Sequence, residues 1–296
     1  MAKKKDVNVN LFRIESNNKD FEKTDFGDQL MSANINSRII LPDGSVKQLR
    51  KFEKRGNYIY GSMIHNQMIN LPPAFNENDN SVEDLDLKDT QGLAYISNFM
   101  FDPELQMLAY ESNSKGVSIG SFLNFCEKNF NIPSLVANVV INPDDFEKVL
   151  KFSVIRTLQV KIARIENGSF FKSKKKSLAE ISKIADETDS NLMDIKLSVG
   201  QSRTESLNVR KVLSMISEFL SFKENKEVSK ILVSGKETYD GLTQVVDLID
   251  SRVKFKFEIE IARYQGLTQV SEIHSKIKDE YEKKKLILKK FYSKKS

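Results

Sequence analysis

Apolar and polar residues alternate along several short segments of the chain, and this alternation predicts β-strands. The clearest case is VKFKFEIEIA at residues 253–262. Side chains alternate between the two faces of a strand, so one face collects every second residue. Here that face is apolar, and it consists of Val253, Phe255, Phe257, Ile259 and Ile261.

The pattern of residues 6–130 predicts strands joined by turns, with few helices. Turn residues separate short apolar segments here, and Phe122, Leu123, Cys126 and Phe130 recur at helical spacing. We therefore expect Cys126 to be a buried core residue. The elements predicted are strands at 7–14, within a meander over 38–69 and in a hairpin over 94–112, helices at 26–35 and 118–130, and an exposed acidic loop at 70–89.

The pattern after residue 131 is more regular and predicts helices packed on a second sheet. Strands are expected at 135–141, 157–165, 192–199 and 228–235, and helices at 143–152, 177–187 and 206–222. The fold class is therefore α+β. The sequence divides into an N-terminal acidic α+β domain, residues 1–131, which is mostly β, and a C-terminal basic α+β domain, residues 132–296.

A long basic helix is predicted at residues 271–296, with a narrow apolar stripe of Ile273, Ile277 and Tyr281. A helix with so narrow a stripe needs packing to persist in water. We expect it to dock on the protein, across a homodimer interface, with His274 exposed. The pentapeptide GLTQV occurs at 241–245 and again at 266–270, but its flanks differ, so it does not indicate a repeat architecture.

Charge is distributed unevenly along the chain. Residues 1–150 hold 16 Lys+Arg and 21 Asp+Glu, whereas residues 151–296 hold 30 and 20. Such asymmetry predicts an acidic and a basic module, and the basic one is expected to face an anionic partner. A single cysteine, no apolar run long enough to cross a bilayer and a basic start without an apolar stretch behind it favour a cytoplasmic protein.

Candidate catalytic chemistry is sparse. Glu258 and Glu260 share a strand face with Lys254 and Lys256, which leaves a metal-dependent nuclease as an alternative, although cross-strand ion pairs explain the pattern better. His65 lacks a second ligand nearby in the sequence, so we expect it to be hydrogen-bonded and structural. The sequence therefore predicts a protein without a cofactor, a metal site or an evident small-molecule substrate, and favours a non-enzyme.

Lysines provide the strongest functional signal. A loop at 166–176 carries several of them beside Phe171, where they could contact phosphates while the aromatic ring stacks on a base. The loop could equally be a solvated connection whose phenylalanines anchor it to the core. The residues predicted to bind nucleic acid are Lys172, Lys174, Lys175, Lys176, Phe171, Lys254, Lys256, Lys284 and Lys285.

The block SVEDLDLKDTQGLAYISNFMFDPELQMLAYESNSKGVSIGSFLNF, residues 81–125, combines an acidic run, a hairpin and a small-residue bend before SFLNF. It resembles the RexA exclusion proteins of lambdoid phages and, more loosely, the KwaB component of the Kiwa defence system. That resemblance implies a homodimer that binds DNA without strong sequence preference and senses phage infection, with a membrane protein or another defence component as a possible partner. The alternative is an assembly subunit with an acidic protein partner.

Overall fold

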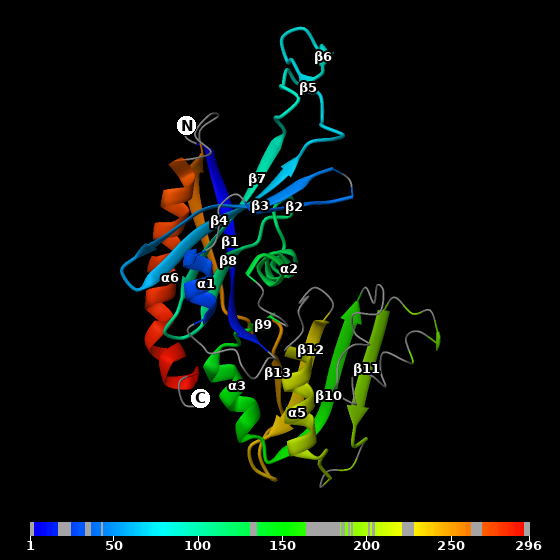
Figure 1. The fold of residues 1–296 in the computed structure, drawn as a ribbon. Coiled ribbons are helices and arrows are strands. Elements are labelled where there is room, and N and C mark those ends of the chain that lie inside the picture. Colours follow the sequence, from blue (N-terminus) through cyan, green and yellow to red (C-terminus); the bar gives the residue numbers. More distant parts are fainter. Residues whose placement is uncertain are drawn as a thin grey trace. The chain divides into compact units, whose positions relative to one another are not determined.

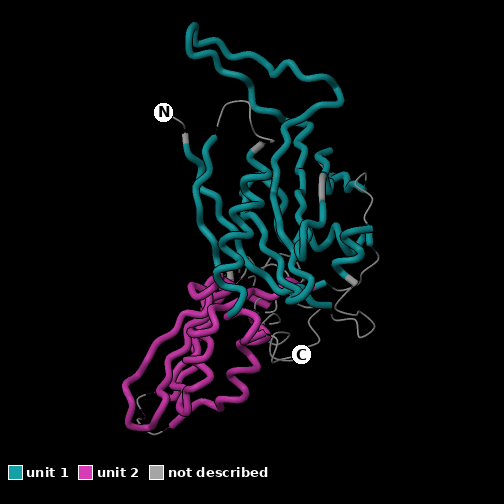
Figure 2. Tube along the Cα trace, turned by 90° about the vertical axis from the view of Figure 1, so that its left-hand side faces the viewer, with its two compact units in different colours: residues 1–135, 254–286 teal, residues 136–253, 287–296 magenta. Residues whose placement is uncertain are grey.

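The computed structural model forms two compact units (Figures 1 and 2), which are residues 1–135 with 254–286 (unit 1) and residues 136–253 with 287–296 (unit 2). The chain passes between the units at three points, which are after Leu135, after Val253 and after Leu286. The structure describes residues 3–16, 25–32, 37–42, 44–130, 135–163, 184, 187–188, 190, 192–200, 202, 205–220, 228–261 and 268–292.

A large antiparallel sheet forms the centre of unit 1, with the strand order β14-β1-β8-β7-β4-β3-β2. Strands from the two ends of the sequence are neighbours in it. The strands and first helices of this unit are β1 (Lys3–Ser16), α1 (Asp25–Ser32), β2 (Arg38–Ile40), β3 (Val46–Arg55), β4 (Tyr58–Gln67), β5 (Ala74–Phe75), β6 (Val82–Glu83), β7 (Leu93–Asp102), β8 (Met107–Glu111), α2 (Ile119–Phe130) and β14 (Lys254–Ile261).

Aromatic side chains pack α1 and α2 on one face of this sheet. Phe101 of β7 meets Phe26 of α1 edge to face at 5.0 Å, and Phe99 lies 5.1 Å from Phe122 of α2, measured between ring centroids. Gly61 of β4 lies beneath Phe99, so close that an added Cβ atom would be 2.2 Å from the ring. Cys126 is fully buried beside this cluster, as the sequence predicts, and burial raises the pKa of its thiol.

The opposite face of the sheet is covered by α6 (Thr268–Tyr292). Successive residues of a strand point to opposite faces, so Phe101 meets α1 while its neighbour Asp102 accepts a hydrogen bond from Tyr281 of α6. The predicted stripe of Ile273, Ile277 and Tyr281 is buried. His274 corrects our expectation of exposure, because it is buried and its Nε2 is hydrogen-bonded to the carbonyl oxygen of Gly61 at 3.0 Å.

Residues 70–92 form an arm that leaves the sheet between β4 and β7 and carries the two-stranded β5–β6 ribbon (Figure 1). Most of its residues are exposed, including Phe75 and Val82, and they match the acidic loop predicted at 70–89.

Unit 2 contains an antiparallel sheet with the strand order β11-β10-β12-β13, and α3 and α5 pack against it. Asn142 caps α3 by accepting from the backbone nitrogen of Asp144, and Pro143 occupies its first turn. The chain enters this unit within β9 (Leu135–Val139), and its elements are α3 (Pro143–Lys151), β10 (Val154–Ala163), β11 (Leu192–Ser198), α5 (Val209–Leu220), β12 (Val228–Lys236) and β13 (Gln244–Asp247).

The α+β class predicted from the sequence is confirmed, with a mostly β N-terminal part and a long C-terminal helix. The division of the chain is different in one respect. The first boundary, between Leu135 and Val136, lies close to the predicted one at 131/132, but residues 254–286 belong to unit 1. The reason is that β14 pairs with β1 and α6 buries its stripe on the same sheet.

Candidate nucleic-acid interface

The outer face of the unit 2 sheet carries three lysines on adjacent strands. Leu158, Val160 and Ile162 of β10 are buried on the face where the helices pack. By alternation, Thr157, Gln159 and Lys161 lie on the other face. Register places Lys161 opposite Lys230 of β12, and Gln159 opposite Lys196 of β11. We call Gln159, Lys161, Asp194, Lys196 and Lys230 the basic sheet face.

The single carboxylate of this face, that of Asp194, leaves two of the three lysine charges uncompensated. Asp194 lies opposite Lys161, yet both of its oxygens accept from Nε2 of Gln159, at 2.8 and 3.1 Å. Within the part of the chain that the structure describes, no ion pair involves Lys161, Lys196 or Lys230. Like charges directly opposite each other on a sheet are destabilising, and a bound anion would remove that penalty.

The loop residues predicted from the sequence, Phe171, Lys172, Lys174, Lys175 and Lys176, lie outside the described residues. In the sequence, the segment that carries them joins β10 to β11, the strands that bear Lys161 and Lys196. They therefore remain candidates for the same interface.

The structure places Lys254 and Lys256 on the edge strand β14 of unit 1, whereas the basic sheet face belongs to unit 2. Both are exposed, and Lys256 forms an ion pair with Asp6 of β1 at 2.9 Å, which raises its pKa through a hydrogen bond. Glu258 pairs with Lys4 at 2.8 Å. These are the cross-strand ion pairs that the sequence favoured over a nuclease centre, and the described residues contain no group of three or more His, Cys, Asp or Glu able to hold a metal ion.

The two predicted lysines of α6 have different surroundings. Lys284 is exposed, whereas the ammonium of Lys285 is turned to the sheet, 3.0 Å from Asp102, 3.2 Å from Glu104 and 3.0 Å from the hydroxyl of Tyr58. Burial alone would lower the pKa of Lys285, but the bonds to Tyr58 and Asp102 raise it well above its usual range. Its charge is therefore neutralised within unit 1, so it is poorly suited to bind phosphate.

Two tyrosines complete this cluster of charged groups beneath α6. Tyr281 donates its hydroxyl to Asp102 at 2.8 Å, and burial followed by the charge of Asp102 raises its pKa far above the usual value. Tyr58 donates to Glu282, and burial is the main cause that raises its pKa to about 12. All of these groups are paired with one another, which makes the cluster an anchor for the helix. Sequence reasoning missed it because Asp102 and Glu104 lie within the hairpin predicted at 94–112, far in the sequence from the helix that supplies their partners.

A family model spans nearly the whole chain. Residues 3–295 match the family of unknown function DUF6731. The chain belongs to this family. The match covers residues of both units. No curated protein matches the chain. None of the helices in the described part of this DUF6731 member is long and apolar enough to cross a membrane.

Proposed function

We propose that this protein binds nucleic acid, with DNA as the expected ligand, through phosphate contacts on the basic sheet face and without catalysing a reaction. The observation that carries the proposal is the arrangement of Lys161, Lys196 and Lys230 around one carboxylate that bonds to Gln159. Lysine ammonium groups contact phosphates as point charges and carry no direct sequence information. The proposed binding is therefore largely independent of sequence.

The charge of the whole unit supports this choice of surface. Unit 1 contains 23 Lys+Arg and 24 Asp+Glu, whereas unit 2 contains 23 and 17. The excess of positive charge thus stays with unit 2 even though most of the basic terminal helix belongs to unit 1. Such a surface increases the rate of encounter with a polyanion. Among the described residues of the basic sheet face there is no aromatic side chain, so stacking on bases would depend on Phe171.

The test replaces Lys161, Lys196 and Lys230 with glutamate and measures binding of labelled duplex DNA at several salt concentrations. Affinity should fall by at least about tenfold, and the slope of log K against log salt should decrease by up to about 0.9 for each duplex phosphate contact that is lost. The matched control replaces Lys54, Lys88 and Lys278, three exposed lysines of unit 1, with glutamate. It changes the net charge equally and should retain most of the affinity. Equal binding by both triple variants would refute the proposed surface.

An acidic protein partner is the second candidate for the same surface. A partner that is pulled down by the parent protein after nuclease treatment, and lost with the triple variant, would favour an assembly role. Plasmid cleavage with magnesium or manganese that is absent from a Glu260→Ala protein would favour a nuclease instead.

The resemblance to phage exclusion proteins extends the proposal to a role in the cell. In the cell, the protein would act as a homodimer that senses phage infection by binding DNA. A membrane protein or another defence component would be its partner. Efficiency of plating on cells that express the parent, the basic-face variant or the unit 1 control tests this role. Protection should be lost only with the basic-face variant.

A further inference from the structure

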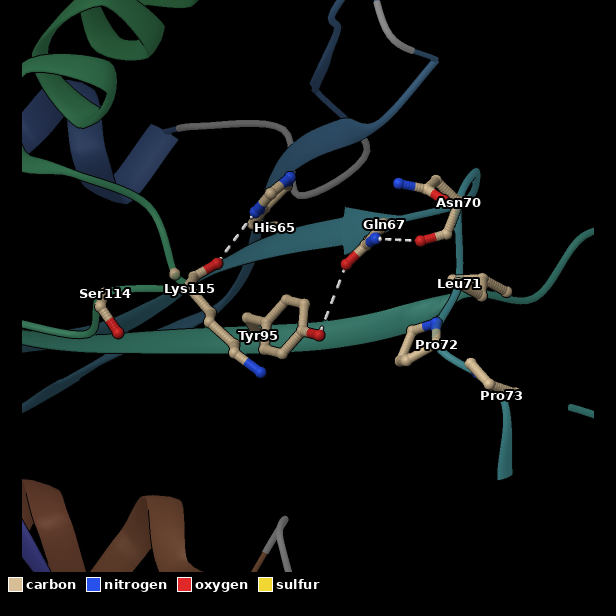
Figure 3. Close-up of a pocket in the computed structure, with 10 residues that line it drawn as sticks. His65, Gln67, Asn70, Leu71, Pro72, Pro73, Tyr95, Ser114 and Lys115 are labelled. Carbon is tan, nitrogen blue, oxygen red and sulfur yellow. Dashed lines mark hydrogen bonds between the residues drawn. The ribbon is translucent and has the colours of Figure 1, made fainter. Parts of the chain in front are cut away.

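A cavity of about 590 Å³ lies in unit 1, where the ends of β4 and β7 meet the turn that precedes α2 (Figure 3). Its volume is in the range of small-molecule sites in proteins. No residue of the predicted nucleic-acid interface lines it, so it is independent of the basic sheet face. The lining residues are His65, Gln67, Asn70, Leu71, Pro72, Pro73, Tyr95, Ser114, Lys115 and Gly116.

Hydrogen bonds hold one wall of the cavity in place. The amide nitrogen of Gln67 donates to the carbonyl oxygens of Asn70 at 2.8 Å and Ile69 at 3.3 Å, and this fixes the turn that leads to the prolines. Asn70 has a φ of 54°, a left-handed conformation that asparagine tolerates better than most residues. Gly92 faces this turn, and a Cβ atom there would lie 2.3 Å from the carbonyl oxygen of Gln67.

The opposite wall is braced in the same way. Asn113 accepts from the backbone nitrogen of Lys115 at 3.2 Å and donates to the carbonyl oxygen of Ile96 at 3.0 Å. Gly116 packs on β7, where a Cβ atom would lie 2.3 Å from Oγ of Ser97. Because both walls are tied to strands, little conformational entropy would be lost when a ligand binds.

The polar groups of the cavity favour an anion. His65 Nδ1 lies 2.9 Å from the carbonyl oxygen of Lys115, and because a carbonyl can only accept, Nδ1 carries the proton. The ammonium of Lys115 lies 5.5 Å from the centre of the Tyr95 ring, and the side chain is exposed. The ten lining residues include no aspartate or glutamate. An anionic ligand thus meets the ammonium of Lys115 without a competing carboxylate.

The remaining lining groups favour a planar ring. Tyr95 is oriented by its hydroxyl, which donates to Gln67 at 3.4 Å, and Figure 3 shows Pro72 beyond that hydroxyl. Aromatic side chains stack on nucleobases of any identity. Asn70 adds a carboxamide, which can both donate to and accept from the edge of a base. The cavity therefore favours a ligand that combines a planar ring with an anionic group.

We infer that this cavity binds a nucleoside monophosphate, with the base against Tyr95 and the prolines and the phosphate at Lys115. The phosphate then takes Lys115 away from the tyrosine ring, whose face becomes available to the base. The inference does not rest on nucleic-acid binding by unit 2.

The experiment titrates the full-length protein with the common nucleoside monophosphates, the corresponding nucleosides and inorganic phosphate, with calorimetry as the measurement. At least one monophosphate should bind about tenfold or more tightly than its nucleoside and than inorganic phosphate. Lys115→Gln should weaken that binding by about tenfold, as expected for loss of a charged hydrogen bond. Tyr95→Leu should weaken it as well, and Lys88→Gln, at an exposed lysine outside the cavity, should leave it unchanged.

Circular dichroism and thermal unfolding without ligand show whether each variant is folded, and Lys115→Gln should unfold like the parent because the side chain is exposed. The inference is overturned if no monophosphate binds at millimolar concentration, or if Lys115→Gln and Tyr95→Leu both bind as the parent does. Loss of duplex DNA binding in the basic-face variant, with monophosphate binding intact, would separate this site from the proposed function.

Discussion

Asp102 is completely buried, and groups from α6 surround its carboxylate. Tyr281 donates to it and Lys285 pairs with it, although both lie about 180 residues later in the sequence. A buried carboxylate without such partners would be strongly destabilising. The position of α6 is therefore coupled to the ionisation of the groups beneath it.

This coupling predicts how stability depends on pH. The pKa of Tyr58 is about 12 in the folded protein, against about 10 in an unfolded chain. Between these values the unfolded state binds fewer protons than the folded state, so the free energy of unfolding should fall as pH rises from about 10 to about 12. The raised pKa of Lys285 acts in the same direction.

Urea unfolding at a series of alkaline pH values measures the effect. The decline should be less steep in Tyr58→Phe, which cannot ionise, and unchanged in Tyr239→Phe, at an exposed tyrosine of unit 2. The same slope in the parent and in Tyr58→Phe would mean that Tyr58 does not contribute.

The burial of single residues was predictable from the sequence where apolar residues recur at helical spacing. Cys126 and Ile277 lie on apolar helical stripes, and both are buried as predicted. His274 and Lys285 were not predictable in this way, because their surroundings come from β4 and β7. In the sequence, the available sign of burial was that each of these polar residues lies beside an apolar stripe. Their partners could not be identified, because most of the chain separates them from the helix.

Helices and strands were predictable where apolar residues recur at a clear helical or strand spacing. The two copies of GLTQV show a case in which the sequence does not decide between helix and strand. Gln244 and Val245 begin strand β13, whereas Thr268, Gln269 and Val270 begin helix α6. The same residues therefore adopt different structures, because the following sequence packs on different partners. Local propensity is too weak to decide such a case.

The docking of α6 leads to a prediction about its apolar stripe. Ile277 is fully buried against the unit 1 sheet, whereas its neighbour Lys278 is exposed. Ile277→Ala should lower the free energy of unfolding by about 2 to 5 kcal/mol, because it removes packing and leaves a cavity. Lys278→Ala should change it by less than about 0.5 kcal/mol. Chemical denaturation compares the two, and a small effect of Ile277→Ala would indicate that α6 contributes little to the fold.

At the scale of the whole molecule, the sequence predicted the α+β class but not that residues 254–286 belong to unit 1. The pairing of β1 with β14 joins residues about 250 positions apart, and hydrophobic alternation does not encode such distances. A signal existed in the charges. Lys4 and Asp6 of β1 are complementary to Glu258 and Lys256 of β14, with which they form ion pairs. Many other segments of a chain with 29% charged residues offer similar matches, so the signal was not specific.

This topology predicts the behaviour of fragments. A protein truncated after Leu135 retains most strands of unit 1 but lacks β14 and α6. Its β1 would become an exposed edge strand, and the sheet face that buries Ile273, Ile277 and Tyr281 would be open to water. We expect the fragment to aggregate or to lack a cooperative unfolding transition. Co-expression with residues 254–296 should recover soluble protein, since those residues supply the missing strand and helix. A soluble fragment 1–135 that unfolds cooperatively by itself would instead show that the N-terminal sheet is an independent domain.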